Sequence, residues 1–137
     1  MERMNKTVKS LTEKFKTSDP FLLAELLDID VQWWNFKEEP KGDTINVLGS
    51  PIILLNDDLK YSDEKYFVCA HELGHAIEHV ELANYYISNK RVKNQYEYQA
   101  DSFAKELLIG LYKEEYGHLP ETYYDLQLAY GYPNQSL

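Results

Sequence analysis

The stretch that decides the fold is YFVCAHELGHAIEHV, from Tyr66 to Val80. Its first part is almost entirely apolar, yet His71, Glu72 and His75 stand in the middle of it. A helix that is apolar on nearly all sides is a buried helix. Buried imidazoles and a buried carboxylate are costly unless they are paired. The segment therefore predicts a buried helix whose polar groups share a specific partner.

A zinc ion is the partner that this spacing favours. On a helix, His71 and His75 lie one turn apart, about 40° around the axis, and Glu72 lies roughly 100° from His71. Two imidazoles can bind one zinc ion, and a carboxylate beside them can take a proton from the attacking water. This is the HExxH pattern of zinc metallopeptidases. The alternative is that both histidines are hydrogen-bonded core residues and that the glutamate lies on the surface. A second, independent feature of the sequence is needed to choose between this alternative and a zinc site.

That feature is NQYEYQADSFAKELLIGLY, residues 94–112. On a helix, Glu97 and Asp101 share one face with three apolar residues, Ala104, Leu108 and Leu111. Carboxylates are rare on a core-facing stripe unless they are paired. A catalytic zinc site needs a third protein ligand, and Glu97 fits that role. Asp101 fits as the acceptor of a hydrogen bond from a ligating imidazole. The alternative role for Glu97 is a capping box with Asn94 as N-cap.

Other spacings narrow the kind of site. A metzincin would need Gly at position 78 and His at position 81, but glutamates stand at both. His79 lies one turn beyond His75 and is a further candidate for a supporting or pocket group. Cys69 points about 160° away from His71 on the helix and is predicted to be a core residue.

Length and pattern predict one α+β domain over residues 1–137, with about 1–17 and 132–137 as candidates for its periphery. Helical patterns and strand patterns alternate along the chain. The expected helices cover 4–29, broken at Ser18-Asp19-Pro20, then 62–86 with Ser62 as cap, 96–112, and a short last helix that ends near Gly131. The expected strands cover 29–36, 44–49 and 50–57, in a hairpin or a meander.

Composition limits the partners. The net charge is −9, with 23 acidic against 14 basic residues, which disfavours direct binding of nucleic acid. A protein that itself binds DNA remains a possible partner. There is no apolar run of membrane-spanning length and no signal-peptide pattern, and the single cysteine fits a reducing compartment. These features predict a cytoplasmic protein without a membrane segment.

Two motifs together resemble the ImmA/IrrE family of zinc metallopeptidases. They are F-x-x-A-HELGH-x-x-x-H, from Phe67 to His79, and E-x-x-A-D-x-F-A-x-x-LL, from Glu97 to Leu108. The resemblance implies a zincin-like fold, in which a small three-stranded sheet packs against an active-site helix and further helices. It also implies one zinc ion per chain, with His71, His75 and Glu97 as ligands and Glu72 as general base.

The family also suggests a biological role. Its members are encoded by bacteria, phages and integrative elements, and many cleave or inactivate a helix-turn-helix repressor of the Xre/cI type. The resemblance thus implies an endopeptidase that hydrolyses a peptide bond in such a DNA-binding repressor. Two alternatives stay open: a non-proteolytic anti-repressor with a structural zinc, and a small acidic interaction domain without metal. The intact Glu72 argues against the first, because a structural zinc site has no use for it.

Two further expectations concern the substrate. The strand SPIILLND, residues 50–57, is expected to offer an exposed edge to an extended peptide. A donor for the tetrahedral oxyanion is also required. The downstream candidates, among which the sequence does not choose, are His118, Tyr112, Tyr116, Tyr123, Tyr124 and Tyr130.

Overall fold

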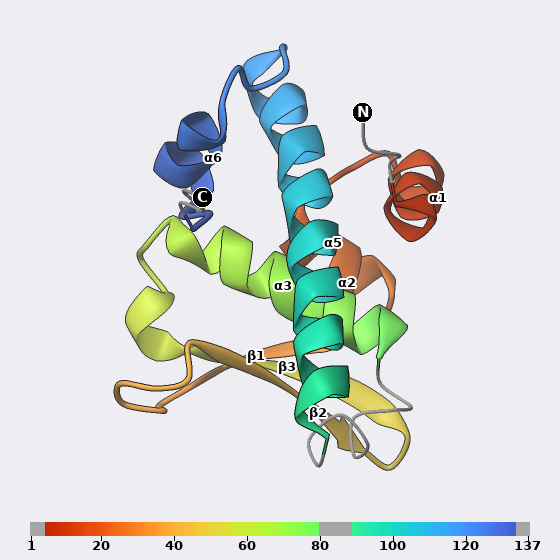
Figure 1. Cartoon of the computed structure of the whole chain (residues 1–137), viewed down its shortest axis with the longest axis vertical. Coiled ribbons are helices and arrows are strands. Elements are labelled where there is room, and N and C mark those ends of the chain that lie inside the picture. The colour runs from red at the N-terminus through yellow and green to blue at the C-terminus, as the bar shows by residue number, and fades with distance from the viewer. Residues whose placement is uncertain (1–4, 80–88, 134–137) are drawn as a thin grey trace.

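The computed structural model describes residues 5–79 and 89–133, and Figure 1 shows how their helices and strands are arranged. The fold is α+β, as predicted, with a small sheet packed against the helices (Figure 1). In chain order the elements are α1 (Lys6–Phe15), α2 (Pro20–Leu26), β1 (Asp30–Trp34), β2 (Gly42–Val47), β3 (Ser50–Asn56), the 3-10 helix η1 (Asp57–Leu59), α3 (Glu64–Glu78), α5 (Lys90–Tyr116) and α6 (Tyr123–Tyr130).

The break between the first two helices lies where the sequence predicts it. The Asp19 carboxylate accepts a hydrogen bond from the Phe21 N–H at 2.9 Å, and Pro20 occupies the first turn of α2. This is a regular N-cap, because proline fits a position whose N–H has no partner within the helix.

The sheet has the order β1-β3-β2. β1 pairs with β3 in parallel, and β2 pairs with β3 as an antiparallel hairpin. The predicted hairpin is thus present, but the meander is wrong because β1 and β2 are not neighbours. The physical reason lies in β3, where Ile53, Leu54 and Leu55 are buried in succession. A strand buried on both faces belongs at the centre of a sheet.

α3 occupies the middle of the molecule. It packs on β2 and β3 on one side, and α5 crosses it on the other (Figure 1). Gly74 allows the two helices to approach closely, since a Cβ atom there would lie 3.1 Å from the Phe103 ring. The crossing sets the start of α5 beside the histidines of α3. Cys69 is fully buried in this core, as predicted, and burial raises the pKa of its thiol.

Residues of the sheet and of α1, α2, α3, α5 and α6 pack together in one hydrophobic core. α5 contributes the stripe that its sequence predicts, because Ala104, Leu108 and Leu111 are buried. The buried members of the core cluster include Val8, Leu23, Ile53, Leu55, Val68, Leu73, Phe103, Leu107, Leu126 and Tyr132. Among the described helices, none is both long enough and apolar enough to cross a bilayer.

α5 begins earlier than predicted. Its first residue is Lys90, and the Asn89 side chain caps it by accepting from the Arg91 and Val92 N–H groups. The predicted start at Tyr96 and the alternative cap at Asn94 are therefore wrong. The polar residues 90–95 suggested a loop, but they form helical turns whose side chains largely face solvent. Glu97 lies two turns into α5, so it is not part of a capping box.

The ends of the other helices agree better with the sequence. The N-cap of α3 is Asp63, one residue after the predicted Ser62, although the Ser62 hydroxyl accepts from the Glu64 N–H at 3.1 Å. α3 ends at Glu78 with His79 as its C-cap, and the rest of the helix predicted to run to residue 86 falls outside the described residues. α6 ends at Tyr130, and Gly131 is its C-cap, with a φ of 71° that suits the left-handed conformation.

Candidate metal centre and active site

The structure brings the three predicted ligands together. The ligand atoms of His71, His75 and Glu97 lie within 4.8 Å of one another. The two carboxylate oxygens of Glu97 each face one imidazole: Oε1 lies 3.0 Å from Nε2 of His71, and Oε2 lies 2.8 Å from Nε2 of His75. The histidines come from α3 and the glutamate from α5, so the crossing of the two helices forms the site.

The site lies at the edge of the core. Glu72 and His75 are buried, whereas the side chains of Glu97 and Asp101 are 40% and 36% exposed. The prediction that both carboxylates project into the core is thus only half right. They continue the apolar stripe of α5 toward its N-terminal part, where the stripe reaches the surface. The His71 side chain is 13% exposed and that of His75 is 6% exposed, so the two imidazoles form the buried side of the site.

The Nδ1 atom of each imidazole, on the side of the ring away from Glu97, contacts another side chain. Nδ1 of His71 lies 2.7 Å from Oδ1 of Asp101, so the predicted contact of Asp101 is present. Nδ1 of His75 lies 2.9 Å from Nδ1 of His79, and Nε2 of His79 lies 2.8 Å from Oε1 of Gln99. His79 is therefore brought to the site, and burial lowers its pKa. Sequence reasoning missed Gln99, because a glutamine on a helix carries no signal until its neighbours in space are known.

Glu72 is fixed from the sheet. The Thr44 hydroxyl on β2 lies 2.7 Å from Oε1 of Glu72 and 3.1 Å from its backbone oxygen. β2 approaches α3 so closely that a Cβ atom at Gly42 would lie 2.7 Å from the Val68 side chain. Thr44 is the second residue that sequence reasoning missed. A threonine in a strand is ordinary, and its contact with Glu72 spans 28 positions of the chain.

The electrostatics of the cluster favour a cation between the carboxylates. Burial alone would lower the pKa of His71, but hydrogen bonds to Asp101 and Glu97 raise it to about 10. Burial would raise the pKa of Glu97, yet hydrogen bonds from His71 and His75 hold it well below its usual range. Burial raises the pKa of the Glu72 carboxyl, against the opposing effects of His71 and Thr44. The carboxylates of Asp101 and Glu97 thus stabilise the protonated imidazole of His71 between them.

The donor set fits zinc. Two imidazole nitrogens and one carboxylate are the protein ligands of a known class of catalytic zinc sites, which leave a fourth position for water. Both Nε2 atoms face the same carboxylate, while both Nδ1 atoms are engaged by other side chains. A hydrogen bond at the ring nitrogen that does not face the metal is typical of metal-binding histidines.

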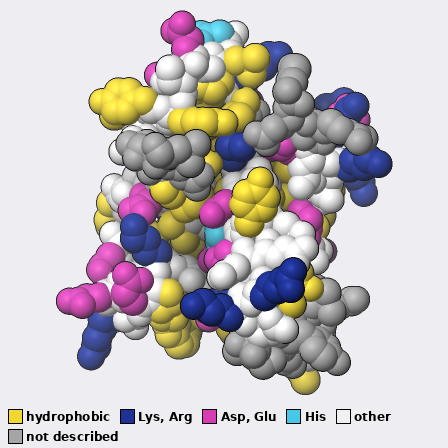
Figure 2. Space-filling view, in the orientation of Figure 1, with side chains coloured by type: hydrophobic (Ala, Val, Ile, Leu, Met, Phe, Trp, Pro, Cys, Tyr) yellow, Lys and Arg dark blue, Asp and Glu magenta, His cyan; other side chains and the backbone are white. Residues whose placement is uncertain are grey.

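A cleft of about 340 Å³ opens beside these groups. His71 and Glu72 share its wall with apolar and charged side chains, namely Glu39, Lys41, Phe67, Val68, Asp101 and Pro133. In the view of Figure 2, a histidine side chain reaches the surface near the middle of the molecule, with acidic side chains beside it. The cleft gives a substrate access to the carboxylate of Glu72 and to one of the two histidines.

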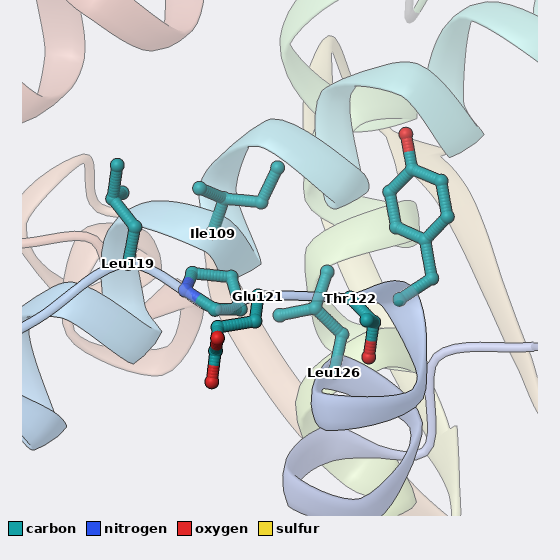
Figure 3. A pocket seen from close by; sticks show the side chains of 7 residues that line it. Ile109, Leu119, Glu121, Thr122 and Leu126 are labelled. Carbon is teal, nitrogen blue, oxygen red and sulfur yellow. The ribbon is translucent and has the colours of Figure 1, made fainter.

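A larger pocket lies elsewhere. Its volume is about 490 Å³, and it is bounded by α5, α6 and the segment between them (Figure 3). Figure 3 shows Ile109, Leu119 and Leu126 around it, with Glu121 as its carboxylate. Its lining lacks the convergent polar groups that mark a catalytic site. Size alone therefore does not identify the active site.

The structure places several candidates for the oxyanion donor away from the cleft. At 1.5 Å per residue, about 28 Å separates Glu97 from the end of α5 at Tyr116, and His118 lies beyond that end. The Tyr130 hydroxyl donates to Glu115. None of these side chains lines the described cleft.

The predicted substrate edge is also wrong. β3 contains the SPIILLND segment, but it has β1 on one side and β2 on the other, so its backbone groups are already paired. The strand at the edge next to the site is β2. Its residues Gly42 and Thr44 face α3, and Gly42 lines the cleft.

Comparison with known proteins agrees with this geometry. The family model Peptidase_M78, described as an IrrE N-terminal-like domain, matches residues 24–129. The chain is also 33% identical over 129 residues to "Uncharacterized immunity region protein 2" of Bacillus phage phi105. That alignment covers 92% of this chain and 81% of the phage protein. The matched range includes both sequence motifs and extends through most of α6.

Proposed function

This chain belongs to the ImmA/IrrE family of metallopeptidases, and from the geometry of its site we propose that it is a zinc-dependent endopeptidase that cleaves a helix-turn-helix repressor. His71, His75 and Glu97 hold one zinc ion per chain, Glu72 is the general base, and Asp101 orients His71. One observation carries the proposal. Two imidazoles and a carboxylate converge within 4.8 Å, and the buried carboxylate of Glu72 lies beside them on the wall of an open cleft.

Each polar group then has a chemical task. Zinc at this site would lower the pKa of a water molecule from about 15.7 toward about 7 and polarise the scissile carbonyl. Glu72 takes a proton from the attacking water and passes it to the leaving amine. The Thr44 hydroxyl holds one oxygen of Glu72, so the carboxylate presents its other oxygen to the water. Burial raises the pKa of Glu72 above that of an exposed carboxyl, so this group accepts a proton more readily than an exposed one.

The substrate lies along β2. Because β3 is paired on both sides, an extended peptide can add to the sheet at the outer edge of β2, beside the cleft. Such pairing holds the backbone of the peptide without reading its sequence, and the side chains around the cleft supply selectivity. Lys41 on the wall forms an ion pair with Glu64, which fixes one side of the opening.

Two observations support a repressor as the substrate. The chain resembles a protein named for the immunity region of a phage. Its net charge of −9 repels DNA and attracts basic surfaces such as those with which repressors contact phosphates. The substrate is accordingly a basic DNA-binding protein, cleaved while it is not covered by DNA.

The test is a cleavage assay with purified helix-turn-helix repressors from the genome that encodes this chain. We expect the zinc-loaded protein to cut one of them at a defined bond, identified by mass spectrometry. A chelator should abolish cleavage, because Glu72 alone does not activate water, and added zinc should restore it. A basic protein without a helix-turn-helix serves as the control, because it shares the charge of the repressors but not their fold. If the chain binds zinc but cuts none of the repressors, the proposed substrate is wrong.

A further inference from the structure

The two histidines of the site have different partners behind them. His71 faces the carboxylate of Asp101, which accepts a hydrogen bond when ionised and so keeps a hydrogen on Nδ1 of His71. His75 faces the imidazole of His79 through two Nδ1 atoms 2.9 Å apart. An imidazole nitrogen either donates or accepts, so this second contact alone does not fix which nitrogen of His75 carries its hydrogen.

Gln99 decides the direction. Its Oε1 atom lies 2.8 Å from Nε2 of His79, and an amide oxygen only accepts hydrogen bonds. The hydrogen of His79 therefore sits on Nε2, and its Nδ1 accepts. His75 must then donate from Nδ1, so its Nε2 is the nitrogen that can give up its proton and offer a lone pair to zinc. That nitrogen donates to Glu97 at 2.8 Å, and zinc binding displaces its proton.

The reverse order would disable the site. If the amide nitrogen of Gln99 faced His79, the hydrogen of His79 would move to Nδ1, and His75 would accept there. His75 would then carry its own hydrogen on Nε2, where a metal ion needs a lone pair. One amide thus determines, through His79, whether His75 can bind zinc.

The surroundings keep this chain of contacts in place. His79 is 3% exposed, and its ring stacks on Tyr96 with centroids 4.3 Å apart and an interplanar angle of 16°. The backbone N–H of His79 donates to the His75 carbonyl at 2.9 Å. Tyr96, Glu97 and Gln99 lie in a single turn of α5, so one turn supplies a ligand and the two groups that hold His79. Burial of His79 limits competition from water for these bonds.

We propose that His79 and Gln99 are positioning residues that hold His75 in the tautomer whose Nε2 binds zinc. The inference rests on the proposed zinc site and deepens it. It assigns His79 a definite task and adds a residue, Gln99, that neither the motifs nor the family match singles out. It also distinguishes the two ligands. The charged carboxylate of Asp101 orients His71, whereas an uncharged chain of hydrogen bonds from Gln99 through His79 orients His75, and we call this chain the relay.

Matched variants test the relay through zinc affinity, measured by competition with a chromophoric chelator. Gln99→Met removes the acceptor at similar size, whereas Gln99→Glu keeps one. His79→Phe keeps a ring for Tyr96 but has no nitrogen, whereas His79→Asn places an oxygen near the position of Nδ1. We expect His79→Phe and Gln99→Met to weaken zinc binding about 10–100-fold. Gln99→Glu and His79→Asn should stay within a few-fold of wild type.

A spectroscopic measurement separates positioning from simple packing. The chain has 4 histidines, so long-range ¹H–¹⁵N spectra of the zinc-loaded protein can report the tautomer of each ring. We expect the hydrogen of His79 on Nε2 in wild type and in Gln99→Glu, and a mixture in Gln99→Met. The thermal unfolding of the chelated Gln99→Met protein should resemble that of the chelated wild type, because the two side chains are similar in size.

Three results would overturn the relay. They are wild-type zinc affinity in both Gln99→Met and His79→Phe, equal losses in Gln99→Met and Gln99→Glu, and a hydrogen on Nδ1 of His79 in the zinc-loaded protein. Failure of wild type to bind zinc is a different outcome. It would remove the proposed function and the relay with it, whereas the first three leave the peptidase intact.

Discussion

Replacing Glu72 by Gln should lower the rate of repressor cleavage by about 10²–10⁴-fold, the usual contribution of a general base. The amide has the shape of the carboxylate and still accepts the Thr44 hydroxyl, but it does not take up a proton from water. Zinc affinity should stay within a few-fold of wild type, because Glu72 is not among the proposed ligands. The measurement is the initial rate of cleavage, with the zinc content determined on the same preparation.

The matched control is Glu121→Gln, the same chemical change in the pocket between α5 and α6, which should leave the rate unchanged. Cleavage by Glu72→Gln at more than about a tenth of the wild-type rate would contradict its role as general base. A variant that no longer cleaves but still relieves repression in cells would indicate an anti-repressor that acts by binding.

Replacing Glu97 by Ala should weaken zinc binding by more than the roughly 100-fold expected when only a supporting contact is lost. The change removes one of three ligands and also the carboxylate that both Nε2 atoms face. The imidazoles then lack a counter-charge and hold a dication less well. Competition with a chelator measures the affinity, and circular dichroism of the chelated protein checks that the helices persist.

Asp101→Asn provides the graded comparison. It keeps the size of the side chain that contacts His71 and removes only its charge, so its effect should be smaller, about 10–100-fold. Zinc affinity that is unchanged in Glu97→Ala would exclude this residue as a ligand. A larger loss in Asp101→Asn than in Glu97→Ala would exchange the roles of the two carboxylates.

The part of the site that depends on the spacing of residues within one helix was predictable from the sequence. The spacing of His71 and His75 places both on one side of any helix, whatever the rest of the chain does. Glu97 was predictable for a different reason, since a carboxylate on an apolar stripe requires a partner. That partner is the histidine pair of α3.

What was missed depends on contacts between distant segments. Thr44 reaches Glu72 only because β2 is an edge strand that lies against α3. The position of β2 follows in turn from the parallel pairing of β1 with β3. Neighbours in the sequence suggested a meander, and only the continuous burial along β3 shows why this strand is central. Gln99 acquires meaning only beside His79.

The early start of α5 illustrates a further limit. Residues 90–95 are polar and gave no apolar period, so they suggested a loop. Their side chains largely face solvent, and Asn89 caps the helix about three turns before Ala100, its first buried residue. A helix can begin before its buried face does, and here the extra turns place Tyr96, Glu97 and Gln99 inside the helix and not at its end.

The central claim is that this cluster binds one zinc ion, and anomalous diffraction at the zinc absorption edge tests it most directly. Crystals of the zinc-loaded protein should show a single strong peak in each chain. It should lie about 2.0–2.2 Å from Nε2 of His71, Nε2 of His75 and one oxygen of Glu97. Absence of a peak between these three side chains in zinc-loaded crystals, or a peak at another set of residues, would contradict the account.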